Sequence, residues 1–143
     1  WMRFVNDYKN LGGRVCAGSD SGFIYQIYGF GLIRELELLQ EAGFNTLEVW
    51  KSATIHSAAL LGMDDEVGSI EIGKRADLLI HKHNPLADTK LMYGTGAMRL
   101  NDDTGQVEWL RSLETTIKGG VLYDTEVLPA DVREMVKQSF DHE

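Results

Sequence analysis

The spacing of apolar residues divides the chain into a helical first part and a strand-rich second part. In residues 2–11 the apolar positions recur at helical spacing, and Gly12-Gly13 is typical of a helix C-terminus. A second helix is predicted over residues 32–42, where leucines share one face, and Gly43 closes it. The first 43 residues therefore predict two amphipathic helices.

A third helix is predicted over residues 45–61, ending at Gly62. Asn45 and Glu48 have the spacing of a capping box, in which each side chain bonds the backbone amide of the other. Helical spacing predicts which residues of the second and third helices are buried: Leu32, Leu36, Leu39, Leu47, Trp50, Thr54, Ala58 and Leu61.

After residue 67 the pattern changes to short apolar runs between turn residues. Gly119-Gly120 predicts a two-residue hairpin turn, because a type I′ turn requires positive φ at both central positions. Residues 92–106 are expected to be an exposed connection, and residues 131–140 a final helix with Val132, Met135, Val136 and Phe140 inward. The predicted strands are 69–72, 78–81, 107–110, 115–118 and 121–123.

A single carboxylate stands among small residues in the segment 15–22, "VCAGSDSG". Residues 14–17 are predicted to form a short buried strand, so Asp20 would follow its end. An aromatic, glycine-broken loop comes next, at 23–31. Taken alone, Gly, Ser and Asp are turn residues, so this cluster favours an ordinary turn over a presented acid.

Composition narrows the possible partners. The 143 residues are 43% hydrophobic and 25% charged, and no apolar run has the length of a membrane span. A net charge of −8 with scattered basic residues argues against nucleic acid and anionic membranes as partners. Cys16 is the one cysteine, which excludes an internal disulfide and favours a reducing, cytoplasmic compartment.

Four segments together resemble the metal-dependent amidohydrolase superfamily, in particular its imidazolonepropionase-like and Xaa-Pro-dipeptidase-like members. The resemblance covers about residues 14–124, and its most specific part is residues 68–79. In chain order, the four segments are "VCAGSDSG", "IRELELLQEAGFNTLEVWKSATIHSAALLGM", "VGSIEIGKRADLLIHKHNPL" and "TTIKGGVLYD".

The resemblance implies an α/β fold: the last part of a (β/α)8 TIM-type barrel, with its eighth strand and following helices, plus the C-terminal portion of a small β-sandwich. Residues 1–63 would belong to the barrel and residues 64–128 to the sandwich, with a C-terminal helix and tail over 129–143. A complete barrel needs about 250 residues, so the chain is expected to be a fragment.

The resemblance also implies a site. Asp20 would be a ligand of a divalent metal, most simply zinc, and would accept a proton from the water that attacks an amide or dipeptide substrate. Ser21, Tyr25 and Tyr28 would contact that substrate. The other ligands have no counterpart in these residues, and one carboxylate cannot hold zinc, so the isolated chain is expected to bind no metal and to be inactive.

Two partners are expected for such a chain: the missing N-terminal portion, or further copies through self-association at unpaired strand edges. His81 and His83 are expected to form a surface pair, His56 to pack within a helix layer and His142 to lie in the tail.

Two other functions remain open. In one, Gly18 to Gly22 is a nucleophile elbow with Asp20 as the attacking carboxylate. In the other, the chain is a non-catalytic assembly or binding module that retains the end of the amidohydrolase fold.

Overall fold

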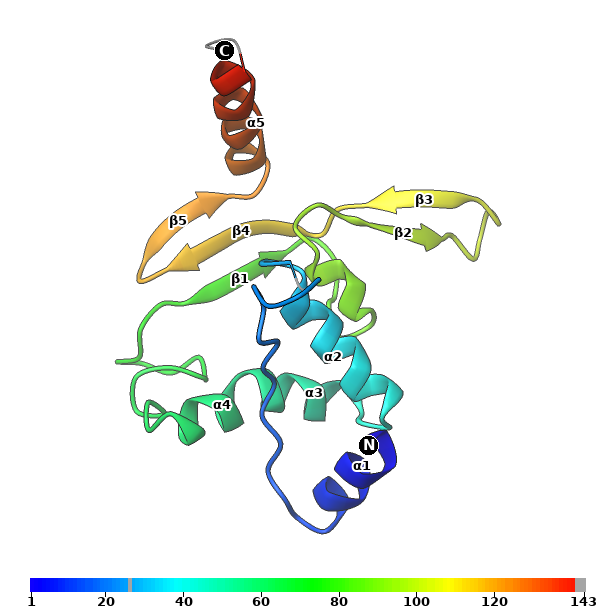
Figure 1. Ribbon diagram of the computed structural model, residues 1–143, viewed down its shortest axis with the longest axis vertical. Helices are drawn as coiled ribbons and strands as arrows, with labels where there is room; N and C mark the ends of the chain where they lie inside the picture. The colour runs from blue at the N-terminus through cyan, green and yellow to red at the C-terminus, as the bar shows by residue number, and fades with distance from the viewer. Residues whose placement is uncertain (26, 141–143) are drawn as a thin grey trace.

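The computed structural model describes residues 1–25 and 27–140 as a mixed α/β chain (Figure 1), so His142 lies outside the described residues. None of the helices in these two ranges has the length and apolar content needed to cross a membrane. The helices are α1 Met2–Asn10, α2 Gly31–Glu41, α3 Thr46–Ala53, α4 Ile55–Leu60 and α5 Val127–Phe140, with a 3-10 turn η1 at Thr89–Met92. The strands are β1 Leu78–His81, β2 Ala97–Leu100, β3 Val107–Leu110, β4 Leu113–Lys118 and β5 Val121–Asp124.

The hydrophobic core lies where α2 turns into α3. Leu36 and Leu39 of α2 pack with Phe44 in the turn and with Val49 of α3, and smaller apolar side chains surround them. Leu36 and Leu39 are buried as predicted, whereas Leu32 is exposed and Ile33 takes its place. This core fixes the angle between the two helices.

Helix α1 packs against this core through a charged residue. Lys9 Nζ lies 2.8 Å from Glu48 Oε2 and 5.1 Å from the centre of the Phe44 ring. The predicted end of this helix at Gly12-Gly13 is confirmed, because the N–H groups of both glycines donate to carbonyls in the last turn of α1.

The helix predicted over 45–61 begins as expected but is not continuous. The Asn45–Glu48 capping box is present, with bonds of 2.8 and 3.0 Å. Thr54 departs from helical geometry at φ −122° and ψ −88°, which separates α3 from α4. Leu47 and Leu61 are exposed, contrary to prediction. The break at Thr54 changes which face of the following helix α4 is turned inward, and α3 buries the small Ser52 beside Val49.

The strand predicted at residues 14–17 does not form. The segment instead lies along the helices, where Ala17 N–H donates to the Ser52 carbonyl at 3.1 Å and the Val15 carbonyl lies 3.2 Å from His56 Nδ1. A strand needs a neighbouring backbone, and no strand among the described residues pairs with this segment.

The main sheet is antiparallel with strand order β1-β4-β5. The predicted hairpin is confirmed, with φ of 57° at Gly119 and 84° at Gly120. Residues 69–72, predicted as a strand, form a loop whose polar side chains bond within it.

Two expectations for the C-terminal half need correction, although the helix predicted over 131–140 is present. The expected connection over residues 92–106 contains β2, which pairs with β3 in a separate two-stranded sheet. Helix α5 begins at Val127 rather than 131, and Figure 1 shows it projecting away from the sheet. Its four predicted inward residues are exposed, because only the end of β5 contacts this helix appreciably among the described elements.

The loop between α4 and β1 is held by the polar residues of the most specific sequence segment. Lys74 Nζ donates to the Asp64 carbonyl and to Ser69 Oγ, both at 2.6 Å. Arg75 N–H donates to the Glu66 carbonyl at 2.9 Å. Gly68, at φ 97°, sits against Ala58, where a Cβ would lie only 2.7 Å from the alanine methyl.

Asp77 ties this loop to the β4–β5 hairpin. Its carboxylate accepts from Gly119 N–H at 2.7 Å, from Lys118 Nζ at 3.0 Å and from Arg75 Nε at 2.8 Å. The Gly119 backbone bond first, and then the two cations, hold the pKa of the Asp77 carboxyl below its ordinary value of 3.8, at about 2.

Replacing Asn45 with alanine removes the acceptor of the Glu48 N–H bond at the start of α3. We expect Asn45→Ala to lower the free energy of unfolding by about 1 kcal/mol, measured by urea denaturation. Lys51→Ala, an exposed position on the same helix, is the control and should change it by much less. Equal effects of the two substitutions would contradict a capping role.

Asp77→Asn should destabilise the hairpin in a pH-dependent way. Because the pKa of Asp77 is lower in the folded protein, its ionised carboxylate stabilises the fold at pH values above the ordinary pKa. That contribution disappears as pH falls from about 4 to about 2. The difference in urea midpoint between the parent chain and Asp77→Asn should therefore be largest near neutral pH and shrink over that range. A constant difference from pH 7 to pH 2 would argue against this role of the charge.

Candidate functional site

The candidate site consists of the loop residues 18–25 and 27–30, together with the first turn of α2. The segment leading into it is anchored by the Ala17 and Val15 backbone contacts to α3 and α4, and Val15 and Ala17 pack against the core. The loop is thus held at its start by the helical layer and at its end by α2. Cys16, expected to be buried, is half-buried in this segment.

Asp20 occupies the middle of a tight, exposed turn. Its φ is 46°, a left-handed conformation that aspartate tolerates better than most residues because its short side chain can bond locally. The hydroxyls of Ser19 and Ser21 on either side lie 2.7 Å apart, so they bond each other rather than the carboxylate. The carboxylate is left exposed to solvent.

Two glycines allow neighbouring groups to approach this turn closely. A Cβ at Gly31, the first residue of α2, would overlap Ser21 Oγ. A Cβ at Gly22, which has φ 100°, would overlap the Tyr28 hydroxyl. The start of α2 and the Tyr28 ring therefore both lie against the Asp20 turn.

Tyr25 lies at a separate pocket of about 370 Å³ beside α2. Phe30 and Tyr93 form one wall, with ring centres 5.9 Å apart. Burial raises the pKa of the Tyr93 hydroxyl. Arg34 also lines the pocket, but its guanidinium is paired with Glu37 at 3.2 Å and Glu41 at 3.0 Å, and these bonds raise its pKa.

The predicted site residues thus divide into two groups. Ser21 and Tyr28 lie at the Asp20 turn, whereas Tyr25 belongs to the pocket next to Phe30 and Arg34. Sequence reasoning missed Tyr93, which is far along the chain. No local pattern could have identified it, because only the packing of η1 against α2 brings it there.

The three histidines in the described part of the chain do not add ligands to Asp20. His56 is engaged with the Val15 carbonyl. The expected His81–His83 surface pair is not seen: His81 is half-buried with Nδ1 3.3 Å from Ser112 Oγ, whereas His83 is exposed beyond the end of β1. Burial lowers the pKa of His81. Within residues 1–25 and 27–140, no three His, Cys, Asp or Glu side chains are grouped so that they could hold a metal ion.

Two proteins of known activity are similar to this chain over short stretches. Imidazolonepropionase from Symbiobacterium thermophilum is 48% identical over 48 residues, which is 30% of this chain and 11% of the relative. 5'-Deoxyadenosine deaminase from Methanobrevibacter smithii is 39% identical over 49 residues, 34% of this chain and 11% of the relative.

Solved structures match over a larger part of the chain. A Xaa-Pro dipeptidase with methionine bound in its active site superposes with a TM-score of 0.65 and 26% identity, covering 86% of this chain and 25% of the dipeptidase. A structure described as a prolidase from Bifidobacterium longum superposes with a TM-score of 0.65 and 30% sequence identity. This match covers 82% of this chain and 25% of the prolidase chain. The chain therefore spans about a quarter of these proteins. The model of the amidohydrolase family matches residues 2–122, and the chain belongs to that family.

Proposed function

We propose that this chain is the C-terminal part of a hydrolase that cleaves C–N bonds of small amides or dipeptides. The observation that carries the proposal is the match of residues 2–122 to the amidohydrolase family. The dipeptidase and deaminase relatives support hydrolytic chemistry, and the one-quarter coverage of the solved structures supports a longer parent polypeptide. On this proposal, catalysis belongs to the parent.

Residues 1–63 would complete the parent's barrel, with residues 14–17 as its eighth strand once neighbouring strands are supplied. The extended course of this segment, held along α3 and α4, supports that assignment. Residues 64–128 would form part of a β-sandwich, and the three-stranded β1-β4-β5 sheet supports this. The tail over 129–143 would correspond to most of α5, which begins two residues earlier.

Asp20 would be this chain's contribution to the catalytic centre. The described residues alone do not fit a metal site, because Asp20 is a single ligand and structural or catalytic zinc takes three or four. In the parent, a divalent ion such as zinc would lower the pKa of a water molecule towards neutrality. The exposed Asp20 carboxylate would accept a proton from that water. It is available to do so because the flanking serines bond each other and not the carboxylate.

Substrate contacts from this chain would come from both parts of the loop. Ser21 and Tyr28 are close enough to the Asp20 turn to orient a polar group of an amide substrate. Tyr25, fully exposed at the rim of the pocket formed with Phe30, would line a more apolar side of the substrate. These roles predict that Ser21 and Tyr28 affect the orientation of the bound substrate more than Tyr25 does.

The parent protein, expressed from the gene that encodes this chain, tests the proposal. It should hydrolyse members of a panel of dipeptides and cyclic amides, lose activity with a chelator and regain it with zinc. Asp20→Asn should lower kcat/KM by about 10²–10⁴-fold. Asp102→Asn, an exposed acid between β2 and β3, is the control and should retain activity. A fully active Asp20→Asn parent would rule out the assigned role.

The approach of α2 to the Asp20 turn can be tested in the 143-residue chain. Gly31→Val should displace the turn, because the new side chain would overlap Ser21 Oγ. We expect the largest amide shift changes in NMR spectra at residues 19–22, with the β1-β4-β5 sheet unaffected. Gly18→Ala, where a Cβ has no neighbour within 4 Å, is the control and should change amide shifts only at its immediate neighbours in the sequence, leaving residues 21 and 22 unchanged. Unchanged resonances at 19–22 in Gly31→Val would contradict the observed contact.

A further inference from the structure

The hairpin of β2 and β3, residues 97–110, forms an arm that extends away from the rest of the molecule (Figure 1). Its strands pair in register, with Met98 opposite Trp109 and Leu100 opposite Val107. A two-stranded sheet with no covering layer is marginally stable in water. The arm is therefore an element whose side chains need a further surface to pack against.

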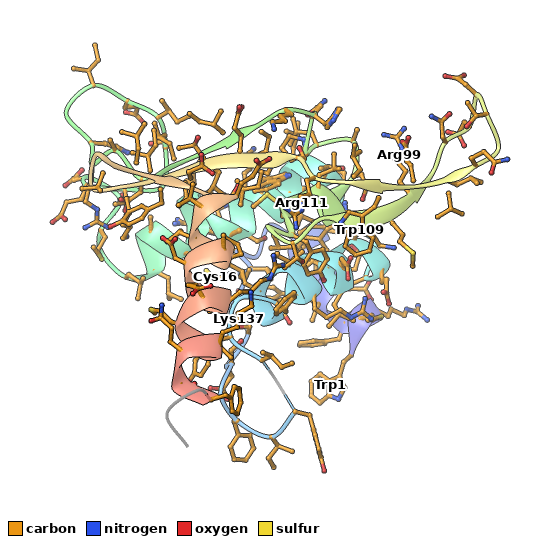
Figure 2. The ribbon with its side chains drawn as sticks, turned by 90° about the horizontal axis from the view of Figure 1, so that it is seen from above. Trp1, Cys16, Arg99, Trp109, Arg111 and Lys137 are labelled. Carbon is orange, nitrogen blue, oxygen red and sulfur yellow. The ribbon has the colours of Figure 1, made fainter. Side chains whose placement is uncertain are left out.

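One face of the arm is entirely apolar and uncovered. Because side chains alternate along a strand, residues 98, 100, 107 and 109 share this face, and their exposed fractions lie between 56% and 69%. The opposite face carries the cross-strand pair Arg99 and Glu108. Figure 2 labels Arg99 and Trp109 on the arm, and the register places them on opposite faces. We call the four-residue surface of Met98, Leu100, Val107 and Trp109 the apolar arm face.

The turn at the end of the arm is closed by hydrogen bonds around Asn101. The Asn101 side-chain oxygen accepts from the N–H groups of Asp103 and Thr104 at 3.0 and 3.1 Å, and Gly105 N–H donates to the Asn101 carbonyl at 2.8 Å. Asn101 N–H in turn donates to the Gln106 carbonyl at 2.9 Å. A preformed arm loses little conformational freedom when it docks, which favours association.

Trp109 is fixed at the base of the arm. Its Nε1–H donates to the Thr95 carbonyl at 3.1 Å. Gly96, at φ 87°, lies beneath the indole, where a Cβ would be 2.5 Å from Nε1. The polar edge of the indole is thus satisfied within the chain, and its apolar surface faces outward as a preformed anchor of the kind that dominates protein interfaces.

We propose that the apolar arm face binds the same face of a second copy of this chain, forming a two-fold dimer. The four residues expose roughly 500 Å² per arm, so two arms would bury at most roughly 1,000 Å², the size of a weak or transient interface. A two-fold contact uses one patch twice, and an uncharged apolar patch is complementary to itself.

Charge at the two ends of the arm supports an antiparallel arrangement. The tip carries Asp102 and Asp103, and Arg111 lies at the base; none of the three forms an ion pair with another described residue. When two arms pack in opposite directions, the acidic tip of each arm lies near the positively charged root of the other arm, and the two tips are kept apart.

Sedimentation of the 143-residue chain tests the dimer. The chain should dimerise in a concentration-dependent way below about 100 µM, as expected for a small interface. Val107→Glu should raise the dimer dissociation constant at least about tenfold, because it buries a charge at the contact. Ile72→Lys, which alters an exposed apolar residue outside the arm, should leave it unchanged. A monomer at 100 µM, or a dimer insensitive to Val107→Glu, overturns the proposal.

Cross-linking identifies which face is in contact without relying on a destabilising substitution. In a Cys16→Ser background, Leu100→Cys should give a covalent dimer with a bismaleimide spanning about 13 Å, because packed sheets lie about 10 Å apart and antiparallel packing offsets the two Leu100 positions by about two residues. Arg99→Cys, its neighbour on the opposite face, should give little. Equal cross-linking at both positions would mean that the arm is not the interface. A dimer built on another surface, or an arm that docks within a longer parent, would give either equal cross-linking or no cross-linking, and both outcomes would overturn the proposal.

Discussion

The Asp77 carboxylate ties the loop that follows the helical half to the turn of the β4–β5 hairpin. The helical half ends at α4 and the sheet begins at β1, and between them the chain is a loop with few apolar contacts of its own. Asp77 bonds the turn of the β4–β5 hairpin while Lys74 bonds the other end of the same loop, at Asp64. Because these bonds satisfy backbone groups as well as charges, the loop has a defined path despite its exposure.

Much of the local structure followed from sequence patterns. Gly12-Gly13, the Asn45 capping box and Gly119-Gly120 were predicted correctly, since each depends only on neighbours in the chain. The errors occur where distant packing decides. Residues 14–17 have the composition of a strand but no partner strand among the described residues, and α5 has an apolar stripe but lies free of the core. The break at Thr54 also could not be predicted, because no glycine or proline marks it.

The candidate site shows the same division. Asp20 and its serines became candidates through the resemblance to the amidohydrolase superfamily, because their residue types alone favoured an ordinary turn, and the structure adds that the serines bond each other. The approach of Gly31 and Tyr28 to the turn, and the contribution of Tyr93 to the pocket, depend on tertiary packing. A sequence pattern can therefore mark a candidate acid, but not the groups that surround it.

Backbone conformation in the loop after residue 18 has a practical consequence. Asp20, Ile24 and Tyr25 all have positive φ, which is costly for residues with a side chain and especially for a β-branched isoleucine. Such a loop keeps its shape only while α2 and the helical layer hold its ends. A synthetic peptide covering residues 18–31 would relax to other conformations, so antibodies raised against that peptide would recognise the folded protein poorly, and inhibitors that copy its sequence would need a cyclic or otherwise constrained backbone.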